Sequence, residues 1–145
     1  MTYLPDVNVL IALIDPAHVA HDEAHAWFER INSRAFATCP LTENGVLRIV
    51  GHPKYPNTPG SPAAVATIVR CIRELRGHVF WPDDLSLMGS ALVDPQRLST
   101  SAQVTDTYLL ALARSHGGQL ATFDRRLTPA TVAGGQEALH LIAGR

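Results

Sequence analysis

The sequence predicts an α/β domain with a mostly parallel sheet that helices cover on both faces. Short apolar segments that can form strands alternate along the chain with longer segments that can form helices. Parallel strands need such crossover connections, and strands buried on both faces are short continuous apolar runs. The chain has 145 residues, 46% of them hydrophobic and 17% charged, which is enough for one well-packed core. We therefore expect residues 1–145 to form a single domain.

Residues 3–14 contain the first predicted strand and helix. The apolar segment Tyr3-Leu4-Pro5 predicts a short buried strand, and Asp6 follows at its carboxyl end. The second apolar run, residues 9–14, predicts a helix for which Asn8 is the N-cap. Ligands of open α/β sheets bind beyond the carboxyl ends of the strands, so Asp6 lies where chemistry is expected.

The next part of the chain predicts a helix, a strand and a second helix before a proline-rich loop. Apolar residues recur at helical spacing over 22–32, and a strand-forming segment follows over 34–39. Pro40 suits the first turn of a helix that continues to Val50. Residues 52–62 contain four prolines, which exclude regular structure, and the length of this loop suggests a flap for substrate or partner.

The clearest helical pattern in the sequence covers residues 62–76, and Gly77 is expected to end that helix. A strand is predicted over 78–81. Asp83 and Asp84 are expected to begin a short helix that ends at Leu92, rather than to belong to a functional site.

The last third of the chain predicts another helix and two strands. Thr105 is the expected cap of a helix that runs from Asp106 to about residue 116. A strand over 119–123 ends at Asp124, and a final strand is expected over 139–142. The alternation of strands and helices thus continues to the end of the sequence.

Composition and charge exclude several classes of protein. The formal net charge is −1, so no overall positive charge indicates binding to nucleic acid. No apolar run reaches the ~18 residues that a membrane span needs, and the N-terminus lacks the basic region of a signal peptide. Cys39 and Cys71 are too few for a disulfide framework or a cysteine zinc site. A cytoplasmic protein without membrane attachment is expected.

Four acids fall at comparable places in this layout. Asp6 and Asp124 each follow a short apolar strand, whereas Glu43 and Asp106 each lie in the first turn of a helix. Strand ends and helix starts share one edge of a parallel sheet, so the four carboxylates are expected to converge. Crowded carboxylates repel each other unless a cation lies between them, and oxygen ligands favour Mg²⁺ or Mn²⁺ over zinc. The pattern therefore predicts a metal-dependent phosphodiesterase or phosphatase.

Four segments also resemble the four motifs of PIN-domain proteins, and among these the VapC toxins of bacterial toxin–antitoxin pairs. They are residues 4–8, Glu43, 104–113 and 120–127, in the order and spacing of the family. The resemblance implies a three-layer α/β/α domain and a magnesium-dependent endoribonuclease that leaves a 5′-phosphate and a 3′-hydroxyl. It also implies an RNA substrate, a cognate VapB-like antitoxin and a homodimer.

The same resemblance gives roles to individual residues. The four acids correspond to the acidic quartet of the family, which is catalytic and holds the metal ion. Asn8 would orient the first carboxylate or a water ligand of the ion, and Thr105 and Thr122 would donate hydrogen bonds to acids beside them. Some relatives carry a further acid where this chain has Leu110, so one ion or two stays open.

Basic residues near these motifs are candidates for contacts with RNA phosphates. They are Arg48, Lys54, Arg125 and Arg126. Solvated surface charge explains the same four residues equally well.

Three other interpretations stay open at this point. A haloacid-type phosphatase would need an aspartate where Asn8 stands, and a non-catalytic PIN domain that binds RNA or protein would not need the acids. His21 and His25 have the spacing of a helical zinc site, but the zinc-protease motif requires glutamate, not Asp22, after its first histidine.

Overall fold

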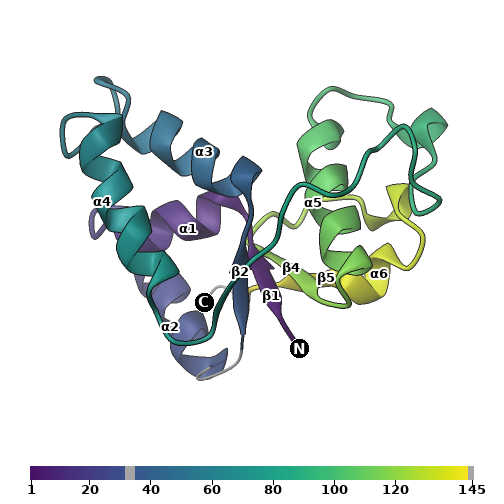
Figure 1. The fold of residues 1–145 in the computed structure, drawn as a ribbon, viewed down its shortest axis with the longest axis horizontal. Helices are drawn as coiled ribbons and strands as arrows, with labels where there is room; N and C mark the ends of the chain where they lie inside the picture. Colours follow the sequence, from purple (N-terminus) through teal and green to yellow (C-terminus); the bar gives the residue numbers. More distant parts are fainter. Residues whose placement is uncertain (32–34, 144–145) are drawn as a thin grey trace.

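The structure, a computed structural model, describes residues 1–31 and 35–143 (Figure 1). Within these residues five strands form one sheet in the order β3-β2-β1-β4-β5, and every neighbouring pair is parallel. The predicted α/β fold is confirmed, and the sheet is wholly parallel in the part that is described. The strands are β1 Tyr3–Pro5, β2 Phe36–Thr38, β3 His78–Phe80, β4 Gln119–Thr122 and β5 Leu139–Leu141.

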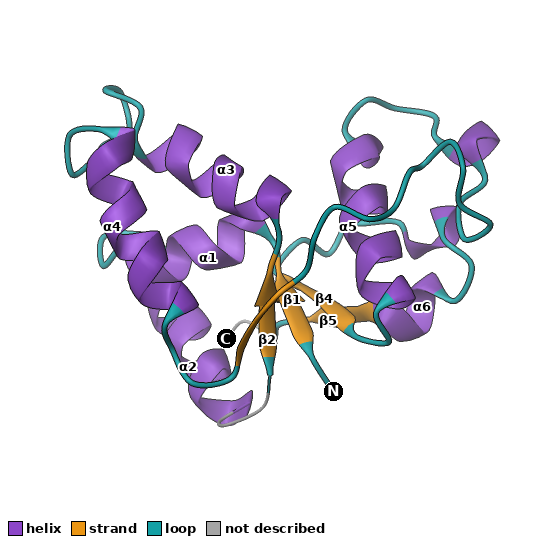
Figure 2. Ribbon diagram, viewed as in Figure 1, coloured by secondary structure: helices purple, strands orange, loops and turns teal. Residues whose placement is uncertain are grey.

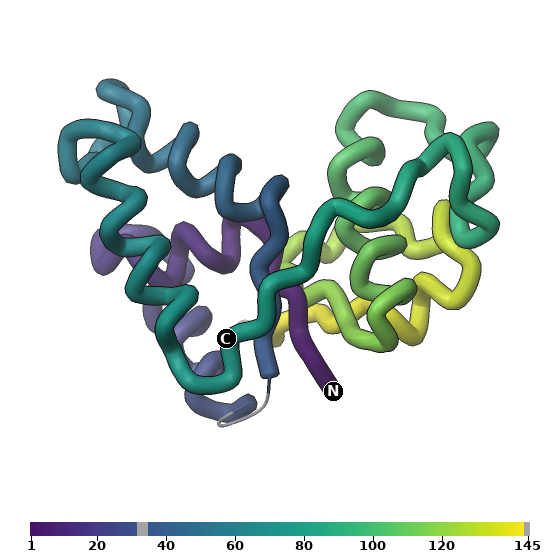
Figure 3. Tube along the Cα trace, viewed as in Figure 1, coloured from purple at the N-terminus to yellow at the C-terminus, as the bar shows by residue number. Residues whose placement is uncertain are grey.

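Helices cover both faces of the sheet, as Figure 2 shows: α1 to α4 lie on one side and α5 and α6 on the other. In the tube of Figure 3, the segment that follows β3 crosses from the first helical layer to the second. This is the three-layer arrangement that the sequence predicts. The helices are α1 Val7–Ile14, α2 His21–Ile31, α3 Pro40–Val50, α4 Pro62–Arg73, α5 Gln103–Ser115 and α6 Gly135–Ala138, with short 3₁₀ helices η1 Pro95–Arg97 and η2 Pro129–Thr131.

The central strand β1 contributes to the core on both of its faces, because side chains alternate across a strand. Tyr3 packs in a cluster with Trp27 of α2, whereas Leu4 belongs to the cluster that contains Leu109 of α5. Both Leu4 and Leu109 are almost completely buried. The two clusters anchor the helical layers to the same strand, so the position of its carboxyl end is firmly determined.

The register of the sheet brings the ends of β1 and β4 side by side. Leu4 is paired with Leu120 and Pro5 with Ala121, and the N–H of Asp6 donates a hydrogen bond of 3.0 Å to the carbonyl of Ala121. The strands are parallel, so the residues that follow both of them lie at one edge. This edge is where the acids were expected.

The short helix predicted over residues 83–92 is wrong, because this stretch is a loop with turns. Its two acids bind α5 instead of capping a helix of their own. Tyr108 donates a hydrogen bond of 2.8 Å to Oδ1 of Asp83, and Nε2 of His116 lies 3.3 Å from Oδ1 of Asp84. These tertiary contacts hold the connection against α5.

Helix α5 begins earlier than the sequence predicts, at Gln103 instead of Asp106. The Gln103 side chain accepts hydrogen bonds from the N–H groups of Ser99 and Thr100, at 2.8 and 3.1 Å, and so closes the preceding loop. Thr105 therefore lies inside the first turn, exposed to solvent, and is not the cap.

At its other end α4 is shorter than predicted: it stops at Arg73, with Glu74 as its C-cap. Gly77, with a φ of +89°, then turns the chain into β3. The helix α6, by contrast, was not predicted at all, because four residues are too few for a periodic pattern.

The proline-rich loop over 52–62 is tied to the end of α1 by one buried carboxylate. Asp15 accepts hydrogen bonds from the hydroxyl of Tyr55, from Nδ2 of Asn57 at 2.6 Å and from the N–H of Ala17 at 2.9 Å. Burial disfavours the charge of Asp15, but these hydrogen bonds outweigh it and hold the pKa below its usual value. A role of this loop as a flap stays a prediction.

His21 and His25 bind backbone carbonyls rather than presenting a metal site. Nδ1 of His21 donates to the carbonyl of Ala12 at 2.7 Å, and Nε2 of His25 donates to that of Leu13 at 2.9 Å. The two imidazoles thus satisfy carbonyls at the C-terminal end of α1, which a helix leaves without partners. The zinc interpretation is disfavoured. In the described part of the chain, no helix is both long and apolar enough to cross a bilayer.

Candidate active site

Asp6 lies at the carboxyl end of β1 and caps α1. Its Oδ1 accepts a hydrogen bond of 2.9 Å from the N–H of Val9, and its Oδ2 accepts one of 2.5 Å from Oγ1 of Thr122. Burial raises the pKa of Asp6, the bonds from Thr122 and Val9 oppose this, and the charges of Asp106 and Asp124 raise it further. The site therefore holds this carboxylate rigidly in surroundings that oppose its charge.

The expected role of Asn8 as the helix cap is wrong, because Asp6 occupies that position. Asp6 has an extended backbone, with φ −72° and ψ 174°, from which its carboxylate reaches the N–H three residues ahead. Asn8 is already inside the helix and its side chain is exposed. Its proposed role in orienting a ligand near Asp6 stays a prediction.

Thr122 links Asp6 to the loop that carries Asp124. The buried hydroxyl of Thr122 donates to Asp6 and accepts a hydrogen bond of 3.0 Å from the N–H of Asp124. Asp124 in turn accepts a bond of 2.9 Å from the N–H of Arg126, whose Nε lies 3.6 Å from the same carboxylate. A continuous hydrogen-bonded path thus joins the ends of β1 and β4.

Asp106 projects from the first turn of α5 toward the same edge. It is half-buried; burial raises its pKa, and the charge of Asp124 adds to the increase. Asp106 and Asp124 both line a cavity of about 340 Å³, together with Gln103, Thr107 and Arg126. The cavity gives solvent, and molecules from solvent, access to these two acids.

Asp6, Asp106 and Asp124 thus form an acidic trio, in which each charge acts on the others. They follow β1, lie in α5 and follow β4, so Asp6 is far in sequence from the other two. The structure brings these three predicted residues together, and crowded carboxylates of this kind are residues that could hold a cation.

Glu43, the fourth predicted acid, is held by other partners. It lies in the first turn of α3, and its Oε2 accepts a hydrogen bond of 2.7 Å from Oγ1 of Thr38 and one of 2.6 Å from Nη1 of Arg73. The threonine hydroxyl has only one proton, which Glu43 receives, so Nε2 of His78, at 2.7 Å, donates to Thr38. Glu43 thus lies on the predicted edge but is neutralised by an arginine.

Arg73 is the residue near the site that the sequence did not reveal. It lies thirty residues from Glu43, near the end of α4, and its guanidinium stacks over the ring of Phe80 at 4.7 Å. No local pattern connects a helix end to an acid on another helix. Only the packing of α4 against α3 brings the two together.

The remaining predicted residues are placed unevenly. Of the four basic candidates, Arg126 contacts an acid of the trio and Arg125 is its exposed neighbour, whereas Arg48 is on α3 and Lys54 in the proline-rich loop. Thr105 is exposed, and the threonine that does support an acid is Thr122. Whether the basic residues touch RNA stays a prediction.

Comparison with known proteins identifies the family of this chain. The PIN domain family matches residues 3–131, which is most of the chain and includes all three members of the trio. The chain belongs to the PIN-domain family.

Relatives of this PIN domain in Mycobacterium tuberculosis carry the name ribonuclease VapC. This chain is 41% identical to ribonuclease VapC44 over 134 residues, which is 92% of the chain and 94% of that protein. It is 42% identical to ribonuclease VapC39 over 139 residues, covering 96% of this chain and the whole of that protein. Ribonuclease VapC29 is 42% identical over 127 residues, 88% of this chain and 89% of the relative.

The donor atoms of the trio fit a hard divalent cation in their chemistry. Each carboxylate oxygen of Asp6 uses one hydrogen bond and keeps a further lone pair, and the partly exposed Asp106 and Asp124 can turn toward an ion. In the described part of the PIN domain, no three His, Cys, Asp or Glu side chains are already arranged as direct ligands. A cation would therefore bind with side-chain rotation or through water.

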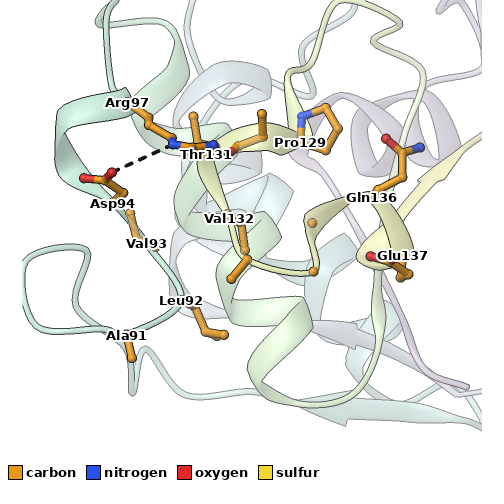
Figure 4. A pocket seen from close by; sticks show the side chains of 14 residues that line it. Ala91, Leu92, Val93, Asp94, Arg97, Pro129, Thr131, Val132, Gln136 and Glu137 are labelled. Atoms are coloured by element: carbon orange, nitrogen blue, oxygen red, sulfur yellow. Dashed lines mark hydrogen bonds and ion pairs between the residues drawn. The ribbon is translucent and has the colours of Figure 1, made fainter.

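A larger cavity than the one beside the trio lies elsewhere, between the segments 91–97 and 129–137 (Figure 4), and has a volume of about 580 Å³. Arg97 lines this cavity, and its side chain donates a hydrogen bond of 3.0 Å to the carbonyl of Ala130. No residue of the acidic trio lines it. Size alone therefore does not identify the site in this domain.

Proposed function

We propose that this PIN domain is a metal-dependent endoribonuclease toxin of the VapC type that uses Mg²⁺, with Mn²⁺ as a substitute. One observation carries the proposal: three mutually repelling carboxylates lie at one edge of the sheet, beside a cavity open to substrate. The similarity to proteins named ribonuclease VapC, over about nine-tenths of the chain, supports RNA as the substrate.

In this proposal Asp6, Asp106 and Asp124 hold the cation, directly or through water. When bound, the cation supplies positive charge that stabilises the oxygens of the phosphodiester during displacement and lowers the pKa of the attacking water. Thr122 and the N–H of Val9 keep Asp6 in one orientation, so little reorganisation is needed as charge develops. RNA would bind over Asp106 and Asp124. Its cleavage would give one product with a 5′-phosphate and one with a 3′-hydroxyl.

Glu43 has a second role in this proposal. It either completes the ligand shell or accepts a proton from the attacking water, and both roles require that its ion pair with Arg73 opens first. Its side chain is only 16% exposed. An opened Glu43 would therefore act in a confined environment.

The two alternative functions find less support. A haloacid-type phosphatase needs an acid at position 8, and the exposed amide of Asn8 cannot act as a general acid or base. A non-catalytic PIN domain would not need to crowd three carboxylates at one edge, where burial and repulsion raise the pKa of Asp6 and of Asp106.

The proposal includes partners and location. A VapB-like antitoxin would block the trio, and an arginine is the side chain that best suits such a cluster of carboxylates. We further propose a cytoplasmic homodimer built of single-domain protomers.

The test is RNA cleavage by the purified protein, with the 5′ ends of the products sequenced. Wild-type protein in Mg²⁺ should give products with 5′-phosphates, and EDTA should stop cleavage. The matched variant Asp106→Asn, checked by circular dichroism, should be inactive. Cleavage at the wild-type rate by Asp106→Asn, or in EDTA, would reject the proposal, and RNA binding without any cleavage would favour the non-catalytic alternative. In the host, wild-type expression should slow growth and Asp106→Ala should not.

A further inference from the structure

A second charged feature lies in the groove between α3 and α4. This groove has a volume of about 260 Å³, and Glu43 lies at the end where α3 begins. Arg70 and Arg73, one turn apart on α4, line the same groove above apolar side chains that include Leu47 and Val69. Two arginines thus follow one wall of a groove that reaches an acid of the predicted quartet.

The two arginines differ in their contacts. Arg73 donates to Oε2 of Glu43 at 2.6 Å, and its guanidinium rests on the ring of Phe80. Arg70 lines the groove without an ion pair to an acid in the described residues, and it is exposed. The chain therefore offers a pair of residues with the same charge and the same groove, of which only one binds Glu43.

The ion pair places Arg73 in competition with a cation for the same carboxylate. Both Thr38 and Arg73 bind one oxygen of Glu43, and a carboxylate neutralised by a guanidinium is a weaker ligand for a second positive charge. By linkage, whatever engages Glu43 weakens its bond to Arg73 by the same free energy. The side chain of Arg73 is 42% exposed, so its guanidinium can turn toward solvent when Glu43 is taken.

We propose that Arg73 is an internal latch: it holds Glu43 while the site lacks its ion, and it binds an RNA phosphate once Glu43 is released. Arg70 supplies one further phosphate contact along the same groove. We call the contacts of Arg73 and Arg70 the phosphate track. The planar guanidinium matches the geometry of phosphate and carboxylate alike, so one arginine can leave the carboxylate of Glu43 and bind a phosphate instead. The inference rests on the proposed function, because it identifies the path of the RNA strand at that site.

The first test measures cation affinity in the absence of RNA, by calorimetric titration with Mn²⁺. Arg73→Gln should bind Mn²⁺ about 3- to 10-fold more tightly than wild type, as expected for a coupling of ordinary size. Arg70→Gln should stay within about twofold, because it loses the same charge but no ion pair. Arg73→Lys should lie between wild type and Arg73→Gln.

A double-mutant cycle separates the latch from the general field of a positive charge. In the Glu43→Gln background, the substitution Arg73→Gln should no longer change Mn²⁺ affinity. An unchanged affinity of Arg73→Gln in the native background, or an equal gain in both backgrounds, would overturn the latch.

The second test measures binding of a labelled single-stranded RNA of mixed sequence whose phosphorothioate linkages resist cleavage, with Mn²⁺ present and the acidic trio intact. Arg73→Gln and Arg70→Gln should each weaken binding about 3- to 10-fold and lower the salt dependence by about one phosphate contact. Wild-type affinity in both variants would contradict the phosphate track. If the native protein fails to cleave RNA, the proposed function fails, but the Mn²⁺ cycle still decides whether Arg73 competes for Glu43.

Discussion

The hydroxyl of Thr122 donates a hydrogen bond of 2.5 Å to Oδ2 of Asp6, across two neighbouring parallel strands. This contact orients the most buried acid of the trio, and the same hydroxyl accepts a hydrogen bond from the N–H of Asp124. One small polar side chain, fully buried, therefore determines how two of the three acids are presented.

Removing this hydroxyl should harm both stability and activity. Thr122→Val keeps the shape of the side chain but leaves a buried carboxylate oxygen without its donor, which costs about 1–3 kcal/mol. The pKa of Asp6 should rise further, because in the wild-type protein this hydrogen bond opposes the effect of burial. Urea denaturation and an RNA cleavage assay measure the two effects.

Thr122→Ser is the matched control, because it retains the donor. It should keep most of the activity and lose less stability than Thr122→Val. Equal behaviour of the serine and valine variants would show that the hydroxyl has no special role.

Neutralising an acid of the trio should stabilise the protein while abolishing cleavage. Asp106→Asn removes a half-buried charge that Asp124 repels, so the melting temperature in EDTA should rise by about 2–4 °C. A lower melting temperature of Asp106→Asn would show that repulsion within the trio does not destabilise the folded protein.

The pH dependence of this effect has a defined sign. The folded-state pKa of Asp106 is raised, so the folded protein binds the proton more tightly than the unfolded chain. Wild-type protein in EDTA should therefore gain stability relative to Asp106→Asn as the pH falls through the folded-state pKa toward the unfolded value of about 3.9. Melting curves of both proteins across this range would measure the difference, and a constant gap would contradict the raised pKa.

Asp15 should show the opposite sign, because its pKa is lowered in the folded state. Its contribution should be complete above the unfolded pKa of about 3.9 and be lost as the pH falls through the folded-state value. Asp15→Asn places an amide N–H against the donors of Tyr55 and Asn57 and should cost about 1–3 kcal/mol. The exposed Glu29→Gln is the control and should be close to neutral.

The same variant should loosen the proline-rich loop, and the chain offers a clean probe for this. Lys54 is the only lysine in the sequence and lies in that loop, so a lysine-specific protease can cut the chain at one place. Cleavage should be faster in Asp15→Asn than in wild type and unchanged in Glu29→Gln. Equal rates in all three proteins would show that Asp15 does not hold the loop.

The sequence predicted the sheet and the trio because both depend on local patterns. A short apolar run followed by an acid identifies the ends of β1 and β4, and parallel strands bring such ends together. Asp6 and Asp124 could therefore be placed at one edge without any knowledge of tertiary contacts.

The errors come from contacts between residues far apart in the chain. Asp83 looked like a helix start, but its carboxylate binds Tyr108 of α5. The pairing of Glu43 with Arg73 was not predicted, because it depends on how two helices pack. Asn8 is a different case: both it and Asp6 are good caps by residue type, and only the backbone angles decide between them.

The most direct test of the three-carboxylate site is a calorimetric titration of Mg²⁺ into the purified protein at one pH. Wild type should bind the ion saturably, and Asp6→Asn, Asp106→Asn and Asp124→Asn should each weaken binding at least about tenfold. Asp94→Asn, an exposed acid outside the trio, should bind like wild type. Wild-type affinity in Asp106→Asn would contradict a cation site formed by these three acids.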